Sequence, residues 1–207
     1  MPGDAGGLFG LETVTPDPGM PRECADIAAI DMNARLARYG AALPHLTEPV
    51  VSVDDFGAKG DGKSDDTDAI QSAIRSLTQG GTVRLSPGKI YVKRDLVVVD
   101  RPDVKIWGYG ALLYSVVTDA EARNAGEARM AIHLSAPRTG IYGLSIATNL
   151  RKRTIGHQNA AGIHLSSEGQ EVIGNRVAYA GMLVRMAQDF LIAGNVVCRA
   201  TADGIHT

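Results

Sequence analysis

The sequence predicts an all-β fold in which short parallel strands stack into a solenoid, a parallel β-helix. A phrase that begins with glycine recurs as Gly162-Ile163-His164-Leu165, Gly181-Met182-Leu183-Val184 and Gly204-Ile205-His206-Thr207. A second phrase, an apolar run that ends in Gly-Asn, occurs at Asn175 and returns at Asn195. The period is about 20 residues, and units of this size bury their apolar side chains only when they are stacked.

Other repeat folds fit these runs less well. Leucine-rich repeats share the period but need a Leu-x-x-Leu-x-Leu frame, which is missing here. Helical repeats are longer than about 30 residues, whereas these runs are short and rich in β-branched residues. Because asparagine tolerates left-handed backbone angles and stacked asparagines hydrogen-bond along a turn, we expect structural roles for Asn175 and Asn195.

The composition limits the classes of function. The chain has 207 residues and is 44% hydrophobic, which suits one substantial domain with an arm. Its apolar runs are of strand length, well below the roughly 18 residues that cross a bilayer, and no secretory signal is visible at its start. With a net charge of −2, the chain lacks the excess of basic residues that is typical of nucleic-acid binders. We therefore expect neither nucleic acid nor a membrane as a partner.

The first residues predict an arm ahead of the solenoid. Residues 1–21 are rich in glycine and proline, which is typical of a flexible lead. Within residues 22–49, the apolar positions from Ile27 to Ala41 follow a helical spacing and predict one amphipathic helix. This helix suits packing against the solenoid or a stalk, and a trimeric coiled coil is the alternative. The β-helix domain then occupies residues 50–207.

The start of that domain joins a strand, a turn rich in glycine and aspartate, and a helix. Ser64, Asp65 or Asp66 can accept hydrogen bonds from the free N–H groups at the helix N-terminus. An apolar face follows, made of Ile70, Ala73, Ile74 and Leu77. Because a terminal repeat needs a cap, we expect this helix to cover the open end of the solenoid.

Calcium is an alternative explanation for the acidic residues of this turn. Asp61 is not followed by the carboxylates of an EF-hand loop, and the twelfth position is Ser72 rather than glutamate. Helix capping accounts for the acids, so we expect no metal and no cofactor. Cys24 and Cys198 have no framework or metal-ligand spacing, and we expect them to be ordinary thiols.

The same segment resembles the N-terminal part of the pectate-lyase-like superfamily. The resemblance lies in the run from Asp55 to Gln71, followed by Gly80-Gly81-Thr82-Val83 and the run from Leu85 to Tyr91. This superfamily includes family 28 polygalacturonases, related lyases and phage tailspike depolymerases. The resemblance implies a right-handed, single-stranded parallel β-helix with an N-terminal capping helix, and an extracellular or cell-surface location. It does not fix a reaction, since hydrolases, lyases and non-catalytic members share this opening.

Alternation along the strands places a set of polar side chains outside the solenoid. If Ile163 and Leu165 face inward, His164 faces outward. The same rule places outward His133, His206 and, two positions after Leu183, Arg185. Neighbouring rungs are about 4.8 Å apart, so these residues can line one groove that binds uronate carboxylates. An outward polar ladder without a ligand is the alternative.

A basic segment leaves the stack after Thr148. It contains Arg151, Lys152 and Arg153, and loops on one face of a solenoid often form its binding surface. Basic residues outnumber acidic ones from Met130 onward, which favours an acidic polysaccharide as the partner. A solvated basic loop is the alternative.

One phrase resembles a catalytic motif. The run from Thr201 to His206 is similar to the Asn-Thr-Asp-Gly-Ile-His phrase of family 28 glycosidases, in which the aspartate is catalytic. The resemblance makes Asp203, together with His206, the catalytic candidate. The first two residues of the phrase differ here, and inverting hydrolysis needs a second carboxyl group, which this face does not offer. Asp-Gly-Ile is also a common turn of β-helices.

The last strand of the sequence predicts an open edge. Thr207 falls within a strand, and natural proteins avoid such exposed edges. We therefore expect the N-terminal part of a carbohydrate-active β-helix protein that cleaves an acidic polysaccharide by hydrolysis or β-elimination, and that is inactive as this fragment. The alternative is a non-catalytic, tailspike-like binding or structural module that self-associates through the open end.

Overall fold

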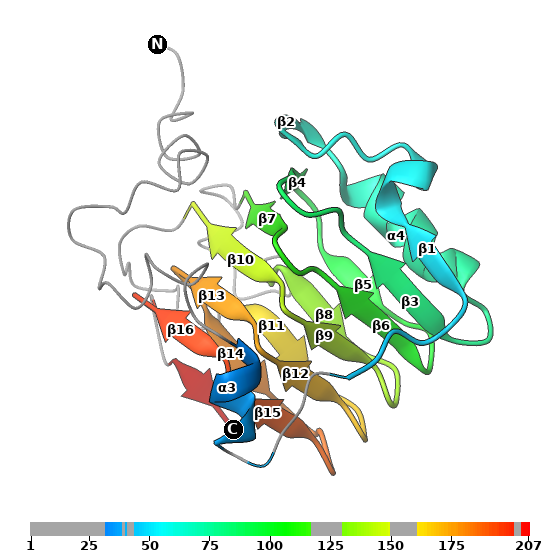
Figure 1. Cartoon of the computed structure of the whole chain (residues 1–207). Helices are drawn as coiled ribbons and strands as arrows, with labels where there is room; N and C mark the ends of the chain where they lie inside the picture. Colours follow the sequence, from blue (N-terminus) through cyan, green and yellow to red (C-terminus); the bar gives the residue numbers. More distant parts are fainter. Residues whose placement is uncertain (1–31, 39, 41–43, 117–129, 150–160, 201–203) are drawn as a thin grey trace.

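The computed structural model describes residues 32–38, 40, 44–116, 130–149, 161–200 and 204–207. Its short strands form three parallel sheets that surround one apolar core (Figure 1). Successive strands along the chain belong to different sheets, so each coil after the first adds one rung to each sheet, and the first coil has α4 where the others have a strand of sheet C. This architecture confirms the predicted parallel β-helix, while its right-handed sense stays a prediction.

The strands are assigned to sheets as follows. Sheet A contains β1 (Val50–Ser52), β3 (Gly81–Arg84), β6 (Val104–Trp107), β9 (Gly140–Tyr142), β12 (Glu171–Ile173) and β15 (Leu191–Ala193). Sheet B contains β2 (Asp61–Asp65), β4 (Ile90–Lys93), β7 (Leu112–Ser115), β10 (Ser145–Thr148), β13 (Arg176–Ala178) and β16 (Val196–Cys198). Sheet C contains β5 (Val97–Val99), β8 (Ile132–Leu134), β11 (Ala161–Leu165), β14 (Gly181–Val184) and β17 (Ile205–His206).

The core consists of side chains that face inward from all three sheets. In sheet A, Ile106 is in register with Ile141 and Ile141 with Val172, and all three side chains are fully buried. Ile163 and Leu165 of sheet C are equally buried, as the alternation predicted. Burying each such side chain contributes roughly 1.5–3 kcal/mol, so the stack depends on the inward positions.

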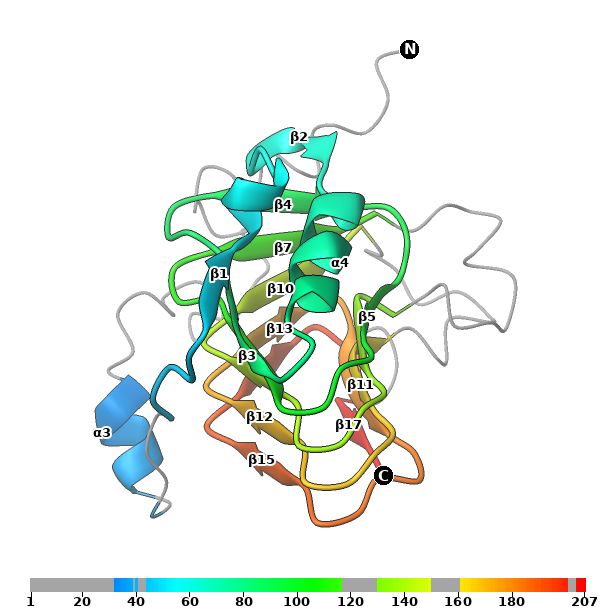
Figure 2. The same cartoon turned by 90° about the vertical axis from the view of Figure 1, so that its right-hand side faces the viewer.

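The helix α4 (Thr67–Ser76) covers the end of the stack. It packs against β5 and the short helix η2 (Val53–Phe56), and its apolar face is buried, as predicted (Figure 2). Asp65 accepts hydrogen bonds from the backbone N–H and the hydroxyl of Thr67, at 3.0 and 2.5 Å. The Asp66 carboxylate instead accepts from the N–H groups of Lys59, Gly60 and Val92, so it joins two coils rather than capping the helix.

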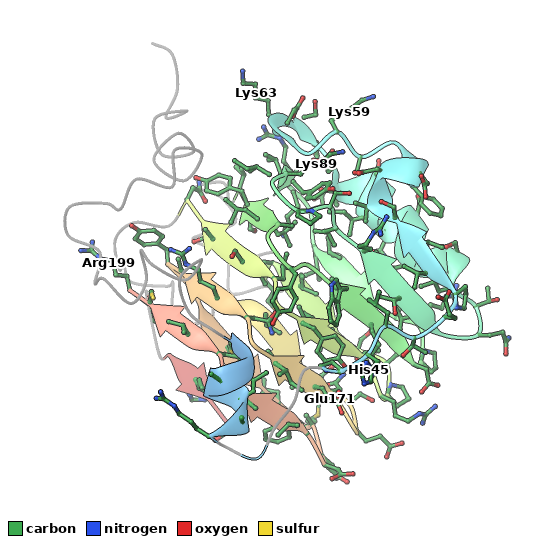
Figure 3. All side chains as sticks on the ribbon, viewed as in Figure 1. His45, Lys59, Lys63, Lys89, Glu171 and Arg199 are labelled. Carbon is green, nitrogen blue, oxygen red and sulfur yellow. The ribbon has the colours of Figure 1, made fainter. Side chains whose placement is uncertain are left out.

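The acidic turn before α4 forms its own hydrogen bonds. Asp61 accepts from the N–H groups of Lys63 and Ser64 and from the Ser64 hydroxyl, and these bonds lower its pKa to about 2. Lys59, Lys63 and Lys89 lie at this end of the stack (Figure 3). The local contacts thus account for the acidic residues of the turn.

Asparagines form a ladder at the turns between sheets A and B. The Asn195 Oδ1 atom accepts from the backbone N–H and the Nδ2 group of Asn175, at 2.8 and 3.1 Å. Asn175 in turn accepts from the Leu144 N–H and donates to the Ile141 carbonyl. The structural role predicted for both asparagines is confirmed.

The outer face of sheet A is covered in part by α3 (Met32–Ala37). Leu36 is fully buried against Tyr142 and Ile173, with Trp107 beside them. The segment between α3 and β1 is tied to sheet A where Thr47 and Thr82 exchange two hydrogen bonds, of 2.7 and 2.9 Å. Helix α3 is the described part of the helix expected within residues 22–49. It packs on the solenoid through Leu36, whereas Ala34 and Ala37 of the predicted apolar face are exposed, so that face was wrongly predicted there.

Two further findings concern Cys198 and the bilayer. Cys198 is disulfide-bonded, so the expectation of an ordinary thiol is wrong. Within the described ranges, no helix has the length and apolar character needed to span a bilayer.

Candidate functional site

A column of polar side chains runs along the outer face of sheet C. His133 is in register with His164, His164 with Leu183, and Leu183 with His206. Neighbouring side chains in the same strands face the core, so these four face outward. The predicted placement of the three histidines on one face is therefore what the structure shows.

The two central histidines stack on each other. The ring centroids of His133 and His164 are 4.3 Å apart, with an interplanar angle of 18°. The Nε2 atom of His133 lies 2.7 Å from the Ser166 hydroxyl oxygen, and that hydroxyl donates to the Leu134 carbonyl at 3.3 Å. Ser166 therefore fixes the orientation of the His133 ring, which in turn supports His164.

His164 is the buried member of the pair. Only 6% of its surface is exposed, and among the described residues neither of its ring nitrogens has a hydrogen-bond partner. Burial, followed by the nearby His133 and Arg185, lowers the pKa of His164 to about 4. At neutral pH the His164 ring is thus uncharged and can donate from one nitrogen and accept with the other.

Arg185 supplies a permanent positive charge on the same face. It directly follows β14, its backbone N–H donates to the Leu165 carbonyl at 2.9 Å, and its side chain is exposed. Arginine stays protonated under all ordinary conditions and binds carboxylates in a bidentate manner. The structure therefore places a cation and a neutral imidazole on neighbouring rungs.

The connections between sheets B and C lie at one corner of the solenoid. The described strands show that the segments after β7, β10 and β16 all join sheet B to sheet C. Lys93 lies at this corner, almost fully buried, and its ammonium group donates to the Met130 carbonyl at 2.8 Å. The strand ends that these segments join therefore lie along one edge of sheet C on successive coils.

Ser166 and Lys93 are site residues that sequence reasoning missed. A signal for Ser166 existed, because the phrase Ile-His-Leu-Ser occurs at both Ile132 and Ile163. The burial of Lys93 could not be predicted from the sequence, since a lysine that follows an apolar strand is usually exposed. Four predicted site residues lie outside the described residues: Asp203, Arg151, Lys152 and Arg153. Across the described ranges, no group of three or more His, Cys, Asp or Glu side chains is placed to hold a metal ion.

Residues 50–126 match the family model described as rhamnogalacturonase A/epimerase, pectate lyase-like. Over these residues the chain is similar to pectate-lyase-like proteins, and its fold is a parallel β-helix. It is 38% identical over 106 residues to alginate lyase 7 of Azotobacter vinelandii. That match covers 47% of this chain and 12% of the lyase, so the chain corresponds to a small part of that protein.

Two solved structures share the fold of this chain. One is the surface adhesin PfbA of Streptococcus pneumoniae, with a TM-score of 0.51 and 16% identity, covering 75% of this chain and 42% of the adhesin. The other is a protein of Parabacteroides merdae described as a candidate glycosyl hydrolase, with a TM-score of 0.52 and 17% identity, covering 75% and 78%. At these identities the likeness concerns the fold alone.

Proposed function

We propose that this chain is part of a protein that binds and cleaves an acidic polysaccharide along the outer face of sheet C. The observation that supports this proposal best is the juxtaposition of the stacked histidines, His133 and His164, with the exposed Arg185. A guanidinium group beside the uncharged imidazole of His164 suits a polymer whose units bear both carboxylates and hydroxyl groups. The match to an alginate lyase over residues of the same domain favours such a polymer.

The basic segment between β10 and β11 extends this proposed binding face. Arg151, Lys152 and Arg153 belong in sequence to the connection between β10 of sheet B and β11 of sheet C, the strand that contains His164. Further cations there would raise the local concentration of a polyanion. We assign all three a role in substrate binding.

The reaction is hydrolysis or β-elimination. For hydrolysis, Asp203 is the proposed catalytic carboxyl group, because of its similarity to the family 28 phrase, and His206, three positions later in the same phrase, is its proposed partner on β17. For elimination, a cation must neutralise the uronate carboxylate while a base removes the adjacent proton. The two reactions give distinguishable products.

The proposal is tested by incubating the chain with alginate and with polygalacturonate. New reducing ends without new ultraviolet absorbance indicate hydrolysis, whereas absorbance of an unsaturated product indicates elimination. Replacing Asp203 with Asn should abolish hydrolysis, and retained hydrolysis would remove Asp203 from the mechanism. Binding that needs Arg185 but not Arg84, an exposed arginine of sheet A, would place the polymer on sheet C. The absence of binding to either polymer refutes the proposal.

A non-catalytic binding module is the second candidate. Its support is a set of exposed apolar side chains on and before the last rung, with Leu191 44% and Ile205 51% exposed. Exposed apolar patches are typical of association sites, so self-association there, as a homotrimer or another oligomer, fits this candidate. Polymer binding without any product, together with a molecular mass in solution that is a multiple of 21.8 kDa, would favour it.

We place the protein outside the cell or on its surface. The disulfide of Cys198 supports this location, because such bonds persist in oxidising compartments. Alkylation of the native protein, with and without reductant, should label Cys198 only after reduction. Labelling without reductant would contradict the proposal.

A further inference from the structure

The outer face of sheet B holds an apolar cluster that is buried. Neighbouring positions in the same strands face the core, so the strand residues of this cluster point outward. Its described members all belong to sheet B or directly follow its strands. The most buried of them, each at most 3% exposed, are Tyr114, Ala147, Ala178 and Tyr179. Sheet A differs, because there Leu36 of α3 completes the outer cluster.

Cys198 extends the same face to β16. It is in register with Ala178, and its neighbour Val197 packs against the core, so the Cys198 side chain points outward. Only 3% of Cys198 is exposed, although no further strand of sheet B follows β16 in this chain. A small side chain in that position stays buried when another segment covers it. The outer face of sheet B therefore has a cover that the described residues do not supply.

The disulfide of Cys198 indicates which segment this is. The sequence contains two cysteines, so within one chain the partner of Cys198 is Cys24. A disulfide joins the two sulfur atoms directly, and the residues around Cys24 must then lie against the residues around Cys198. The bond thus brings the start of the arm to the face whose cover is missing from the described residues.

The position of α3 is compatible with this connection. Ala193 of β15 packs against the cluster that contains Leu36, and the five steps of chain from Ala193 to Cys198 span at most about 17 Å. Residues 25–31 separate Cys24 from the start of α3, and an extended chain of that length spans about 25 Å. The segment before α3 is therefore long enough to pass round the corner between sheets A and B and reach Cys198.

The charges of the two surfaces are complementary. Arg176 on β13 points outward two positions before Ala178, and it is half-buried, with a pKa that burial lowers. Arginine is the residue that proteins most readily use for partly buried ion pairs with carboxylates. Glu23 and Asp26 flank Cys24 in the sequence. A segment with these two acids suits a covered face that includes an arginine.

We propose that residues 22–31 cover the outer face of sheet B and are fastened there by a disulfide between Cys24 and Cys198. The arm then covers two faces of the solenoid, sheet B beside Cys198 and sheet A through Leu36. The bond also shortens the free chain that precedes α3, so α3 docks on sheet A at a smaller cost in chain entropy. This docking surface is independent of the function proposed for sheet C.

The first test identifies the disulfide in the full, unreduced chain by tryptic digestion and mass spectrometry. We expect one linked pair of peptides, with Cys24 and Cys198, that separates on reduction. Trypsin isolates each cysteine, because it cleaves after Arg22, Arg35, Arg185 and Arg199. On a non-reducing gel the protein should migrate as a monomer of 21.8 kDa. A covalent dimer, which means bonds between two chains, or free thiols at both cysteines would overturn the proposal.

The second test asks whether this segment is the cover, by hydroxyl-radical labelling of tyrosines in the full chain. In Cys24→Ser, labelling of Tyr114 and Tyr179 should rise at least about threefold, because a segment without the bond opens locally more often. Labelling of Tyr91, which is fully buried in the core, should stay the same and shows that the stack is intact. If Tyr114 and Tyr179 stay protected in Cys24→Ser, another segment covers sheet B and the proposal fails.

Discussion

The outer faces of sheets A and C are built on the same rungs but hold opposite kinds of side chain. On sheet A, Trp107, Tyr142 and Ile173 form an apolar surface that Leu36 of α3 covers. The Tyr142 hydroxyl donates to the Glu171 carboxylate at 2.6 Å, and the Glu171 side chain lies toward α3 (Figure 3). On sheet C, the stacked imidazoles include one whose nitrogens have no partner among the described residues.

The difference shows how a solenoid separates stability from recognition. Inward positions of both sheets belong to one shared core and must stay apolar. Outward positions are free to differ, so one face can bind a segment of the chain itself while another keeps polar groups unsatisfied. Four substitutions test this division, from the largest expected effect to the smallest.

An inward substitution should harm both faces at once. Leu165 is fully buried, and Leu165→Ala should lower the free energy of unfolding by about 2–5 kcal/mol, since it leaves a cavity. Chemical denaturation followed by circular dichroism measures this loss. The exposed Arg84→Ala serves as the control, with a change within about 0.5 kcal/mol. Equal effects of the two substitutions would contradict a shared core.

A substitution on sheet A should disturb that face alone. A Cβ atom at Gly140 would meet the Tyr142 ring and hydroxyl, so Gly140→Ala should cost about 1–3 kcal/mol. The fluorescence of Trp107, whose ring lies 6.2 Å from that of Tyr142, should change as well. Adding Tyr142→Leu should restore part of the loss by removing the clash. No restoration would mean that the clash is not the cause.

Removing the contact of α3 should release that helix without unfolding the solenoid. Leu36→Ala exchanges a fully buried side chain for a small one, and the local opening of α3 should become easier by about 1–2 kcal/mol. Hydrogen exchange over residues 32–37 measures this change. Protection of β9 and β12 should stay the same, and its loss would show that α3 supports the rungs directly.

On sheet C, removing a side chain should stabilise the protein. His164→Leu deletes a buried group without partners, and we expect a gain of about 1 kcal/mol at pH 7. Because the folded pKa of His164 is about 4 and its ordinary value is 6.5, the unfolded chain binds more protons between these values. The unaltered protein should therefore lose stability as the pH falls from 6.5 to 4, and His164→Leu should lose less. If His164→Leu lowers the free energy of unfolding at pH 7, the outer face of sheet C does not hold an unsatisfied polar group at a cost in stability, and the proposed difference between the outer faces of sheets A and C is wrong.

The sequence allowed the fold and part of the site to be predicted, for different physical reasons. Alternation along strands is strict, so Ile163 inside and His164 outside followed from the apolar pattern alone. The stacking of His164 on His133 could be predicted, because a repeat of fixed register places equivalent positions side by side. The absence of hydrogen bonds to the His164 ring nitrogens could not be predicted, since it depends on all the residues around the ring.

Contacts between distant segments escaped sequence reasoning. The aromatic surface of sheet A joins Trp107 and Tyr142 from different coils, and Leu36 from the arm completes it. Trp107 and Tyr142 hold equivalent positions in the runs Ile106-Trp107-Gly108 and Ile141-Tyr142-Gly143, but Leu36 belongs to no repeated phrase. The disulfide of Cys198 was missed as well, because the cysteines have no framework or metal-ligand spacing in the sequence.

The corner between sheets B and C has a consequence for how such proteins diversify. The segments after β7, β10 and β16 all depart there, yet the strands on either side keep their register with the rungs above and below. A connection at that corner can therefore gain, lose or exchange residues without shifting a single inward side chain. New ligand preferences can therefore arise through changes in one connection at a time, while the strands of the sheets keep the same positions.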